Sequence, residues 1–290
     1  LADVAGDPRY RLVRGDIRDA EAVAAAAEGC DAIVNVAAET HVDRSILGGD
    51  EFVTTNVLGT KRLLDAARAR GARYLQVSTD EVYGDVEEPH RSSEGDALAG
   101  SSPYAASKAG GDLLVLAYAR TYGLDASITR GSNTYGPYQF PEKLIPLFTS
   151  NALEGRPLPV YGDGRQVREM LWVGDHVRAI DLVLRAGEAG AAYNVGAEQE
   201  VANIETARRI VELTGADPAL ITFVADRPGH DRRYALDCSR LRALGWTREV
   251  AFPDGLARTV AWYRDERAWW EAIRAERAFA EYHAQNYADR

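Results

Sequence analysis

The sequence is poor in cysteine, and this scarcity limits the kinds of site that it can build. The 290 residues include two cysteines, Cys30 and Cys238, which show neither CxxC pairing nor metal-ligand spacing. We therefore expect two buried free thiols. The five histidines are also scattered, with no HxH or HExxH pattern among them, so the sequence predicts no metal site.

Long apolar runs and positive charge are lacking as well. No stretch approaches the roughly 18 to 20 apolar residues of a membrane helix, and LADVAGDPRY at the start lacks the basic-then-apolar pattern of a signal peptide. The net charge of -10 argues against a general nucleic-acid binder, because such proteins need a basic surface to displace counterions from phosphates. We expect a globular protein of the cytoplasm with neither membrane nor nucleic-acid partners.

The sequence does contain an alternation of buried strands and helices. Apolar runs at 30–38 and 72–79 each lead through a polar exit into a helical stretch, at 52–71 and 102–123, and a third strand follows at 124–131. Ser101 or Ser102 is the candidate N-cap of the second helix, with Pro103 in its first turn. Because the strands are apolar throughout, we expect an α/β fold, a Rossmann-like doubly wound parallel sheet with ligands at the carboxyl ends of its strands.

After residue 135 the composition shifts towards proline, glycine and charged residues, which predicts a smaller, mixed α/β lobe. We expect residues 1–134 and 169–197 to form the first domain, and residues 135–168 and 198–290 to form the second. The stretch 168–187 is expected to return a helix to the first domain. The segment 261–283 is typical of an amphipathic helix whose tryptophans pack against the body of the protein.

One element expected of a nucleotide-binding fold does not occur in the sequence. Such folds open with a strand and a G-x-x-G-x-x-G turn, whose backbone amides cradle a pyrophosphate at a helix N-terminus. No such turn precedes GDIRD at 15–19. Either a longer protein supplies this strand, turn and helix, or the fold lacks them.

Two short segments carry the residues best suited to chemistry. In STDEVYG at 78–84, a buried strand ends in Thr79 and two adjacent acids, Asp80 and Glu81. In SPYAASKA at 102–109, Tyr104 and Lys108 are four residues apart and share one helix face. A nearby ammonium favours the phenolate, which makes a tyrosine of reference pKa about 10 usable as a base.

Together these segments resemble the extended short-chain dehydrogenase/reductase family, and within it the dTDP-glucose 4,6-dehydratases. The resemblance also runs through SNTYGPYQFPEKLIP and six further segments, at 15–19, 37–45, 55–60, 158–164, 167–176 and 226–237. It implies NAD as cofactor and dTDP-glucose as substrate, dehydrated to dTDP-4-keto-6-deoxyglucose. It also implies a homodimer that pairs the TNVLGT and Tyr104 helices.

The resemblance implies a role for each residue of the two segments. Tyr104 would accept the C4 hydroxyl proton while hydride passes to NAD, with Lys108 lowering its pKa and binding the nicotinamide ribose. Thr79 would hydrogen-bond the C4 oxygen. Glu81 would then remove the C5 proton and Asp80 would protonate the departing C6 hydroxyl, before hydride returns to C6. A dehydratase thus has a use for two neighbouring carboxyls.

The resemblance also implies two sets of binding residues and shows two departures. The cofactor set is Asp16 and Ile17 at the adenine, Ala37 and Ala38 at the strand exit, and Asn56, Ser78, Tyr104 and Lys108. The substrate set is His41, Asn133, Lys143, Tyr161, Arg168, Asn203, Arg227 and His230. Thr134 stands where these dehydratases typically have a second Asn, and Gly131 where Cys is common, which affects the expected placement of the sugar.

Several other activities share these features. A GDP-mannose 4,6-dehydratase, a UDP-glucuronate decarboxylase and a 4-epimerase share the fold, NAD and the Tyr-Lys pair. The doublet of Asp80 and Glu81 argues against the last two, because epimerases need neither acid and decarboxylases usually keep only the Glu. A non-catalytic protein that binds NAD or a sugar nucleotide is the alternative of a different class.

Overall fold

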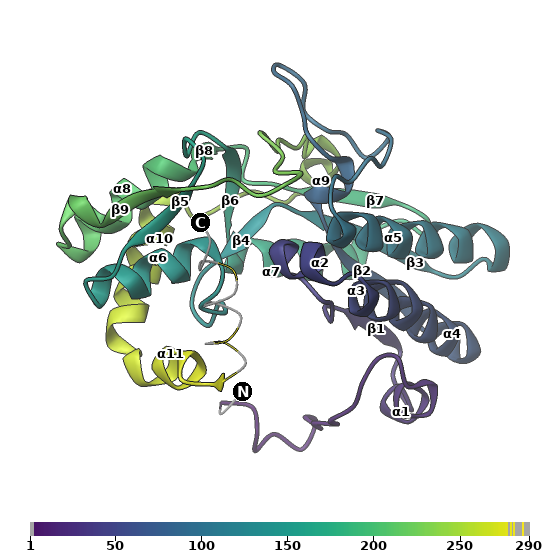
Figure 1. Ribbon diagram of the computed structural model, residues 1–290. Helices are drawn as coiled ribbons and strands as arrows, with labels where there is room; N and C mark the ends of the chain where they lie inside the picture. The colour runs from purple at the N-terminus through teal and green to yellow at the C-terminus, as the bar shows by residue number, and fades with distance from the viewer. Residues whose placement is uncertain (1–2, 278, 280, 282–285, 287–290) are drawn as a thin grey trace.

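The central feature of the fold is a sheet of four parallel strands, seen in a computed structural model that describes residues 3–277, 279, 281 and 286. The strand order is β1 (Ala32–Asn35), β2 (Arg73–Thr79), β3 (Ala126–Gly131) and β7 (Ala192–Val195), and each neighbouring pair is parallel (Figure 1). The predicted α/β fold with a doubly wound parallel sheet is confirmed.

Helices cover both faces of this sheet. Helices α4 (Thr60–Arg70) and α5 (Pro103–Tyr122) pack on one face, and α7 (Val173–Ala186) packs on the other. On β2, Tyr74 points into the core with α4 and α5, whereas the next residue, Leu75, points into the core with α7. The central strands β2 and β3 are buried on both faces, where polar side chains such as Gln76 and Arg130 accompany the apolar ones, and α7 is the helix expected to return to the first domain.

The ends of the two long helices follow the sequence signals, but the first helical stretch is interrupted. Ser102 caps α5 by accepting a hydrogen bond from the Ala105 amide, and Gly71 ends α4 in the left-handed conformation, with φ of 66°. Between α3 (Asp50–Val53) and α4, however, residues 54–59 form a wide π-helical turn, η1 (Thr54–Gly59). Asn56 in this turn donates to the hydroxyl of Ser107 on α5 at 2.9 Å, which ties the turn to α5.

A second group of elements surrounds a separate apolar core. Strands β4 (Asn133–Tyr135), β6 (Val167–Trp172) and β8 (Glu200–Ala202) form one sheet, and β5 (Leu158–Tyr161) pairs with β9 (Ile221–Val224). Helices α6 (Leu144–Leu153), α8 (Asn203–Thr214) and α10 (Phe252–Asp265) contribute to the same core. The division of the chain at the residue numbers given above stays a prediction.

Short elements connect these two groups and the chain ends. They are α1 (Ala20–Ala26), α2 (Val42–Leu47), η2 (Asp80–Tyr83), η3 (Pro218–Leu220), α9 (Ser239–Ala243) and α11 (Arg267–Arg274). The helix expected over 261–283 is interrupted at Glu266, between α10 and α11, and its residues 278, 280, 282 and 283 lie outside the described part of the chain. Trp270 is fully buried, as expected, and Trp262 and Trp269 contact Tyr138.

The cysteine prediction was half wrong. Cys238 is buried, but Cys30 is exposed, because it precedes the start of β1 and lies outside the apolar core. In the described part of the chain, no helix is long and apolar enough to cross a membrane, and no group of three or more His, Cys, Asp and Glu side chains could hold a metal ion.

Candidate active site

The two adjacent acids lie where β2 ends in a helix cap. The Thr79 hydroxyl oxygen accepts a hydrogen bond from the Glu81 amide at 3.3 Å, and the hydroxyl donates to Asp80 Oδ1 at 3.1 Å. Asp80 is only 2% exposed, and its Oδ2 has no hydrogen-bond partner among the described residues. The apolar pattern of β2 therefore ends after Val77 because Thr79 caps the helix η2, whose first residue, Asp80, has its carboxyl in the interior.

The surroundings of Asp80 favour its protonated form. Burial raises the pKa of its carboxyl well above the ordinary value, and the negative charges of Glu81 and Glu169 raise that pKa further. The positive charge of Arg168 and the hydrogen bond from Thr79 act in the opposite direction. Asp80 is thus suited to keep a proton that it can give to a leaving group.

The charges that act most strongly on Glu81 are positive, whereas those that act most strongly on Asp80 are negative. Burial raises the pKa of Glu81 as well, but the three largest opposing influences are cations, Arg227, Arg168 and Lys143. The cations favour the charged carboxylate of Glu81, whereas anions disfavour that of Asp80. Such a difference in surroundings separates the pKa values of two carboxyls, so that one can act as an acid and the other as a base.

Tyr104 and Lys108 are buried on α5, next to this doublet. Burial and the charge of Glu81 raise the pKa of Tyr104 above its ordinary value, and a hydrogen bond with Thr79 opposes the change. Lys108 Nζ donates to the Val77 carbonyl at 2.7 Å, and burial lowers the pKa of Lys108 to about 8. In the protein alone the phenol form of Tyr104 is favoured, so its conversion to a base by Lys108 stays a prediction.

A large pocket opens beside Glu81. It contains about 1040 Å³ of space, part of it open to solvent, between α2, β4, β5, β6 and the segments around them. All eight residues of the predicted substrate set line it: His41, Asn133, Lys143, Tyr161, Arg168, Asn203, Arg227 and His230. The structure thus brings together residues that are up to 189 positions apart, His41 to His230.

The pocket gathers the cations Lys143, Arg168 and Arg227 although the chain as a whole is acidic, and its lining also includes the acids Asp43, Glu81 and Glu142. Burial lowers the pKa of His41 to about 2, and the cations Lys143, Arg44 and Arg227 contribute to the same effect. Burial and neighbouring arginines also lower the pKa of His230, to about 4. Both histidines are therefore neutral near pH 7, and the positive charge is that of lysine and arginine, which suits a diphosphate ligand.

Hydrogen bonds hold several of the pocket side chains in place. Arg168 donates to the Asp231 carbonyl at 3.0 Å, and its guanidinium lies 4.3 Å from the centre of the Tyr234 ring. Asp43 accepts a hydrogen bond from the Tyr161 hydroxyl at 3.1 Å and lies 3.5 Å from Arg227. Asp43 thus forms part of the wall of the pocket.

Polar atoms without partners mark the pocket as a site for a polar ligand. Buried side-chain atoms of Asn133 (Oδ1), Gln139 (Oε1), Asn203 (Oδ1) and Arg227 (Nε) have no hydrogen-bond partner within the described residues. Such atoms are uncommon in folded proteins because each costs free energy, and they need an explanation. A nucleotide sugar, rich in donors and acceptors, supplies one.

The residues of the cofactor set occupy two places. Ala37 and Ala38 follow the end of β1 after one intervening residue, and Ser78 lies on β2 with a buried hydroxyl that lacks a hydrogen-bond partner among the described residues. Asp16 and Ile17 line a second, apolar pocket with α1, where the exposed Asp16 pairs with Arg18 at 2.6 Å. Small residues at a strand exit, a buried ammonium and an unpaired hydroxyl fit the nicotinamide half of NAD.

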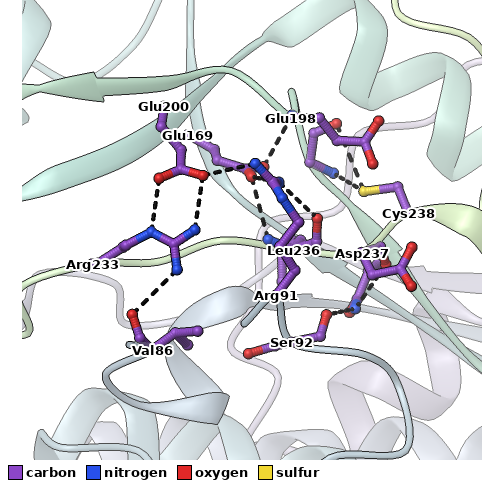
Figure 2. Close-up of polar contacts among 12 residues, drawn as sticks. Val86, Arg91, Ser92, Glu169, Glu198, Glu200, Arg233, Leu236, Asp237 and Cys238 are labelled. Carbon is purple, nitrogen blue, oxygen red and sulfur yellow. Dashed lines mark hydrogen bonds and ion pairs between the residues drawn. The ribbon is translucent and has the colours of Figure 1, made fainter. Parts of the chain in front are cut away.

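A ring of ion pairs braces the chain segments around the site. Figure 2 shows Arg91, from the loop between η2 and α5, bound to Glu169 on β6 and Glu200 on β8, both at 2.7 Å. Arg233 binds Glu200 at 2.7 Å and donates to the Val86 carbonyl. Arg233 belongs to residues 225–238, here called the strap, which also carry Arg227 and His230. The ring thus links the strap to the loop that follows the acid doublet.

The two departures from the dehydratase pattern are coupled in space. The His176 ring on α7 lies against Gly131, where an added Cβ would be 2.6 Å from His176 Cε1. The Thr134 hydroxyl is 2.7 Å from His176 Nδ1. Gly131 thus makes room for a ring that Thr134 holds, next to the pocket residue Asn133. The sequence shows both departures, but no local pattern in it indicates their contact with His176.

Comparisons with known proteins agree with this geometry. Residues 2–259 match the family model described as GDP-mannose 4,6 dehydratase. The chain is 52% identical over 277 residues to the dTDP-glucose 4,6-dehydratase of Streptomyces niveus, covering 95% of this chain and 82% of that protein. The chain belongs to the dTDP-glucose 4,6-dehydratase family.

Solved structures of a dTDP-glucose 4,6-dehydratase and of a UDP-glucose 4-epimerase have folds similar to that of this chain. The dTDP-glucose 4,6-dehydratase of Streptomyces venezuelae, solved with NAD and a second ligand bound, superimposes with a TM-score of 0.92 at 53% identity, covering 94% of this chain and 85% of that one. A UDP-glucose 4-epimerase of Thermus thermophilus, solved with NAD, gives a TM-score of 0.83 at 31% identity, covering 91% and 90%. The dehydratases are thus more similar in sequence than this epimerase.

Proposed function

We propose that the chain catalyses the NAD-dependent dehydration of dTDP-glucose to dTDP-4-keto-6-deoxyglucose. The observation that carries this proposal is the pair of carboxyls with unlike surroundings, Asp80 and Glu81, at the wall of a pocket lined by cations. A dehydratase needs one carboxyl with a proton and one without, and the electrostatic surroundings of these two differ in that sense.

Elimination of water is assigned to the doublet. Once C4 is a ketone, the C5 hydrogen is acidic, and the Glu81 carboxylate removes it as a proton. Asp80 gives its proton to the C6 hydroxyl, the C6–O bond breaks and water leaves. Glu81 later returns a proton to C5, so its charge is restored at the end of the cycle.

Oxidation at C4 is assigned to Tyr104, with Thr79 and Lys108 as supporting groups. Bound NAD would supply the hydride chemistry, accepting hydride from C4 and returning it to C6, so that the overall reaction involves no net oxidation. Tyr104 accepts the proton of the C4 hydroxyl, and this proton balances the one that Asp80 loses. Because burial disfavours the phenolate of Tyr104, the positive charge of the oxidised nicotinamide and of Lys108 is needed to form it.

Binding of the substrate is assigned to the pocket. Lys143, Arg168 and Arg227 offer the charge and the guanidinium forks that a diphosphate requires. The cofactor set, Asp16, Ile17, Ala37, Ala38, Asn56, Ser78, Tyr104 and Lys108, is proposed to hold NAD. We also propose that the chain divides into two domains at residues 134, 168 and 197. We further propose that the protein is located in the cytoplasm.

Mass spectrometry of dTDP-glucose incubated with the NAD-loaded protein tests this function. We expect the loss of one water with no net reduction of NAD, abolished in an Asp80→Asn, Glu81→Gln double variant and kept in Glu205→Gln, which changes an exposed acid on α8. An unchanged substrate mass in a protein that carries NAD would overturn the proposal. Turnover of UDP-glucose or of UDP-glucuronate in parallel incubations would instead indicate an epimerase or a decarboxylase.

We further propose that the protein is a homodimer formed through α5 and the neighbouring turn. Large apolar side chains are exposed there and at the end of α3, with Leu58 on η1 38%, Leu113 on α5 58% and Val53 on α3 55% accessible. The turn η1 and α5 pack against each other, so these side chains belong to adjacent parts of the surface. An exposed apolar area of this kind on two packed helices is typical of a protein interface.

A further inference from the structure

A buried ion pair lies beneath the Tyr104 and Lys108 helix. Asp112 follows Lys108 by four residues on α5, so the two side chains share one helix face. Asp112 is 0% exposed, and its Oδ2 accepts a hydrogen bond at 2.8 Å from Arg130 Nε, on the adjacent strand β3. Arg130 itself is only 2% exposed. Lys108, Asp112 and Arg130 thus form a row of buried charges of alternating sign.

The row continues to the acid doublet. Arg130 Nη1 donates to the Tyr83 hydroxyl at 2.8 Å, and Tyr83 donates in turn to Asn194 Oδ1 on β7 at 2.7 Å. Tyr83 is the last residue of η2, the short helix that begins with Asp80 and Glu81. Arg130 therefore connects the helix that carries Tyr104 and Lys108 to the helix that carries the two acids.

The other oxygen of Asp112 remains without a partner. Asp112 Oδ1 and the Ser78 hydroxyl are both buried and make no hydrogen bond of normal geometry among the described residues, but the hydroxyl lies close enough to the carboxyl to lower its pKa. Burial raises that pKa, and the charge of Arg130 is the largest opposing influence. Arg130, Lys108 and the Ser78 hydroxyl thus favour the charged form of Asp112 against the effect of burial.

We propose that Asp112 is a positioning residue for the reaction: its carboxylate, held by Arg130, is the counter-charge that keeps the buried Lys108 amine protonated. This inference rests on the proposed function for its catalytic meaning, because Lys108 serves there as a cation. A lysine buried to this extent loses its proton easily, and a nearby negative charge opposes that loss together with the hydrogen bond to the Val77 carbonyl. Asp112 is the charged group that raises the pKa of Lys108 against burial.

The sign of the effect follows from the groups around Lys108. The Val77 carbonyl on β2 accepts a hydrogen bond from Lys108, Arg130 on β3 binds the Asp112 carboxyl, and Asp112 is the charged group that acts on the pKa of Lys108. Replacing Asp112 by Asn removes a negative charge and leaves the positive charge of Arg130. The pKa of Lys108 should therefore fall below its value of about 8.

The sequence offers an unusually direct measurement of this change. The chain contains three lysines, Lys61, Lys108 and Lys143. In protein labelled with ¹³C at lysine Cε, the NMR signals can be assigned by single Lys→Arg variants and titrated with pH. Lys61 is a surface residue paired with Asp65, 43% exposed, and serves as the internal control. This titration needs no substrate, so its outcome does not depend on the proposed activity.

We expect the titration midpoint of Lys108 to fall by about one pH unit or more in Asp112→Asn, with Lys61 unchanged. The conservative variant Asp112→Glu should keep the midpoint near that of the parent protein. If Asp112→Asn does not fold because Arg130 is left unpaired, the double variant Asp112→Asn, Arg130→Met takes its place, with a smaller decrease expected. A midpoint of Lys108 that is the same in the folded variant and in the parent protein would overturn the inference.

The pH dependence of dehydration is the second readout. In Asp112→Asn the decline of kcat/KM at high pH should begin at lower pH, by the same interval as the NMR midpoint of Lys108. A purely structural role of Asp112 would lower kcat/KM equally at all pH values. Failure of the proposed function would abolish turnover in the parent protein and leave the lysine titration intact, so the two failures can be distinguished.

Discussion

At the scale of single residues, burial of the Asp80 carboxyl suits the proposed chemistry but lowers the stability of the folded protein near neutral pH. Its pKa is raised in the folded protein, so the stability that it contributes is present at low pH and lost as pH rises from the unfolded value of about 4 through its folded pKa. Asp80→Asn removes this loss of stability, because the amide of Asn does not ionise as pH rises. We expect the variant to be more stable than the parent at pH 7 to 8, by on the order of 1 kcal/mol, and to show little gain near pH 4.

Thermal unfolding of both proteins across this pH range is the measurement. Asp163→Asn is a suitable control, because Arg232 and a backbone hydrogen bond hold the pKa of this exposed carboxyl low, at about 2. That variant should not gain stability with rising pH. An Asp80→Asn variant whose melting temperature stays below that of the parent throughout would contradict the account of Asp80.

The residues that the sequence identifies are those with a local signal. Thr79, Asp80 and Glu81 interrupt an apolar strand, and Tyr104 and Lys108 have helical spacing. Asp112 had the same signal, since it follows Lys108 by four residues, and it was missed. Arg130 had none, because its contact with Asp112 depends on how β3 packs against α5.

At the scale of elements, the contact between β3 and α7 explains a departure from the family pattern. An added Cβ at Gly131 would lie 2.6 Å from His176 Cε1, and the ring is buried and held by Thr134. We expect Gly131→Ala to lower the free energy of unfolding by about 1–3 kcal/mol, because a packed ring has to move. The measurement is chemical denaturation.

Two further variants make this prediction specific. Gly48→Ala should have little effect, because nothing lies within 4 Å of an added Cβ there. Gly131→Ala combined with His176→Ala should be more stable than the sum of the two single changes predicts, because the clash is removed. Strict additivity would mean that His176 is not what restricts position 131.

The ion-pair ring makes a prediction about substrate binding. Glu200 accepts hydrogen bonds from both Arg91 and Arg233, so Glu200→Gln weakens the link between the strap and the loop after η2. Because the strap carries Arg227 and His230, we expect KM for dTDP-glucose to rise several-fold, with a smaller change in kcat. Steady-state kinetics of Glu200→Gln and the surface control Glu205→Gln measure this. An equal KM in both variants would exclude a role of the ring in binding.

Some features of the elements could not be expected from local patterns. The stretch 52–71 has a continuous helical pattern, yet a π-helical turn interrupts it at 54–59, where Asn56 is bound by Ser107 on α5 and by the backbone at Glu39. These partners are distant in the sequence. The pattern of strands and helices, in contrast, follows from hydrophobicity, and the parallel sheet followed from it directly.

At the scale of the whole molecule, η1 and α5 expose apolar side chains on adjacent parts of the surface, which the proposed dimer would bury. Leu113→Glu places a charge in the proposed interface, and we expect it to shift the protein from dimer to monomer in light scattering coupled to size exclusion. Val177→Glu is the matched control, since Val177 on α7 is similarly exposed, at 57%. A parent protein that is monomeric at micromolar concentration would contradict the proposed dimer.

The pocket also shows what a global property can and cannot reveal. The net charge of -10 correctly describes the composition, but it gives no indication of the cations gathered around His41 and His230. Folding brings Lys143, Arg168 and Arg227 together from separate segments. The set of pocket residues came from the family resemblance, since no local pattern in the sequence joins them.

The division of roles between Asp80 and Glu81 is the centre of the account, and hydrogen exchange at C5 tests it most directly. The measurement is mass spectrometry and NMR of dTDP-glucose incubated in deuterium oxide with NAD-loaded Asp80→Asn and Glu81→Gln. We predict that Asp80→Asn, which retains the base, incorporates deuterium at C5 while water loss falls by about 10²- to 10⁴-fold. Glu81→Gln should show neither exchange nor water loss. Exchange in Glu81→Gln, or its absence in Asp80→Asn, would contradict the assignment.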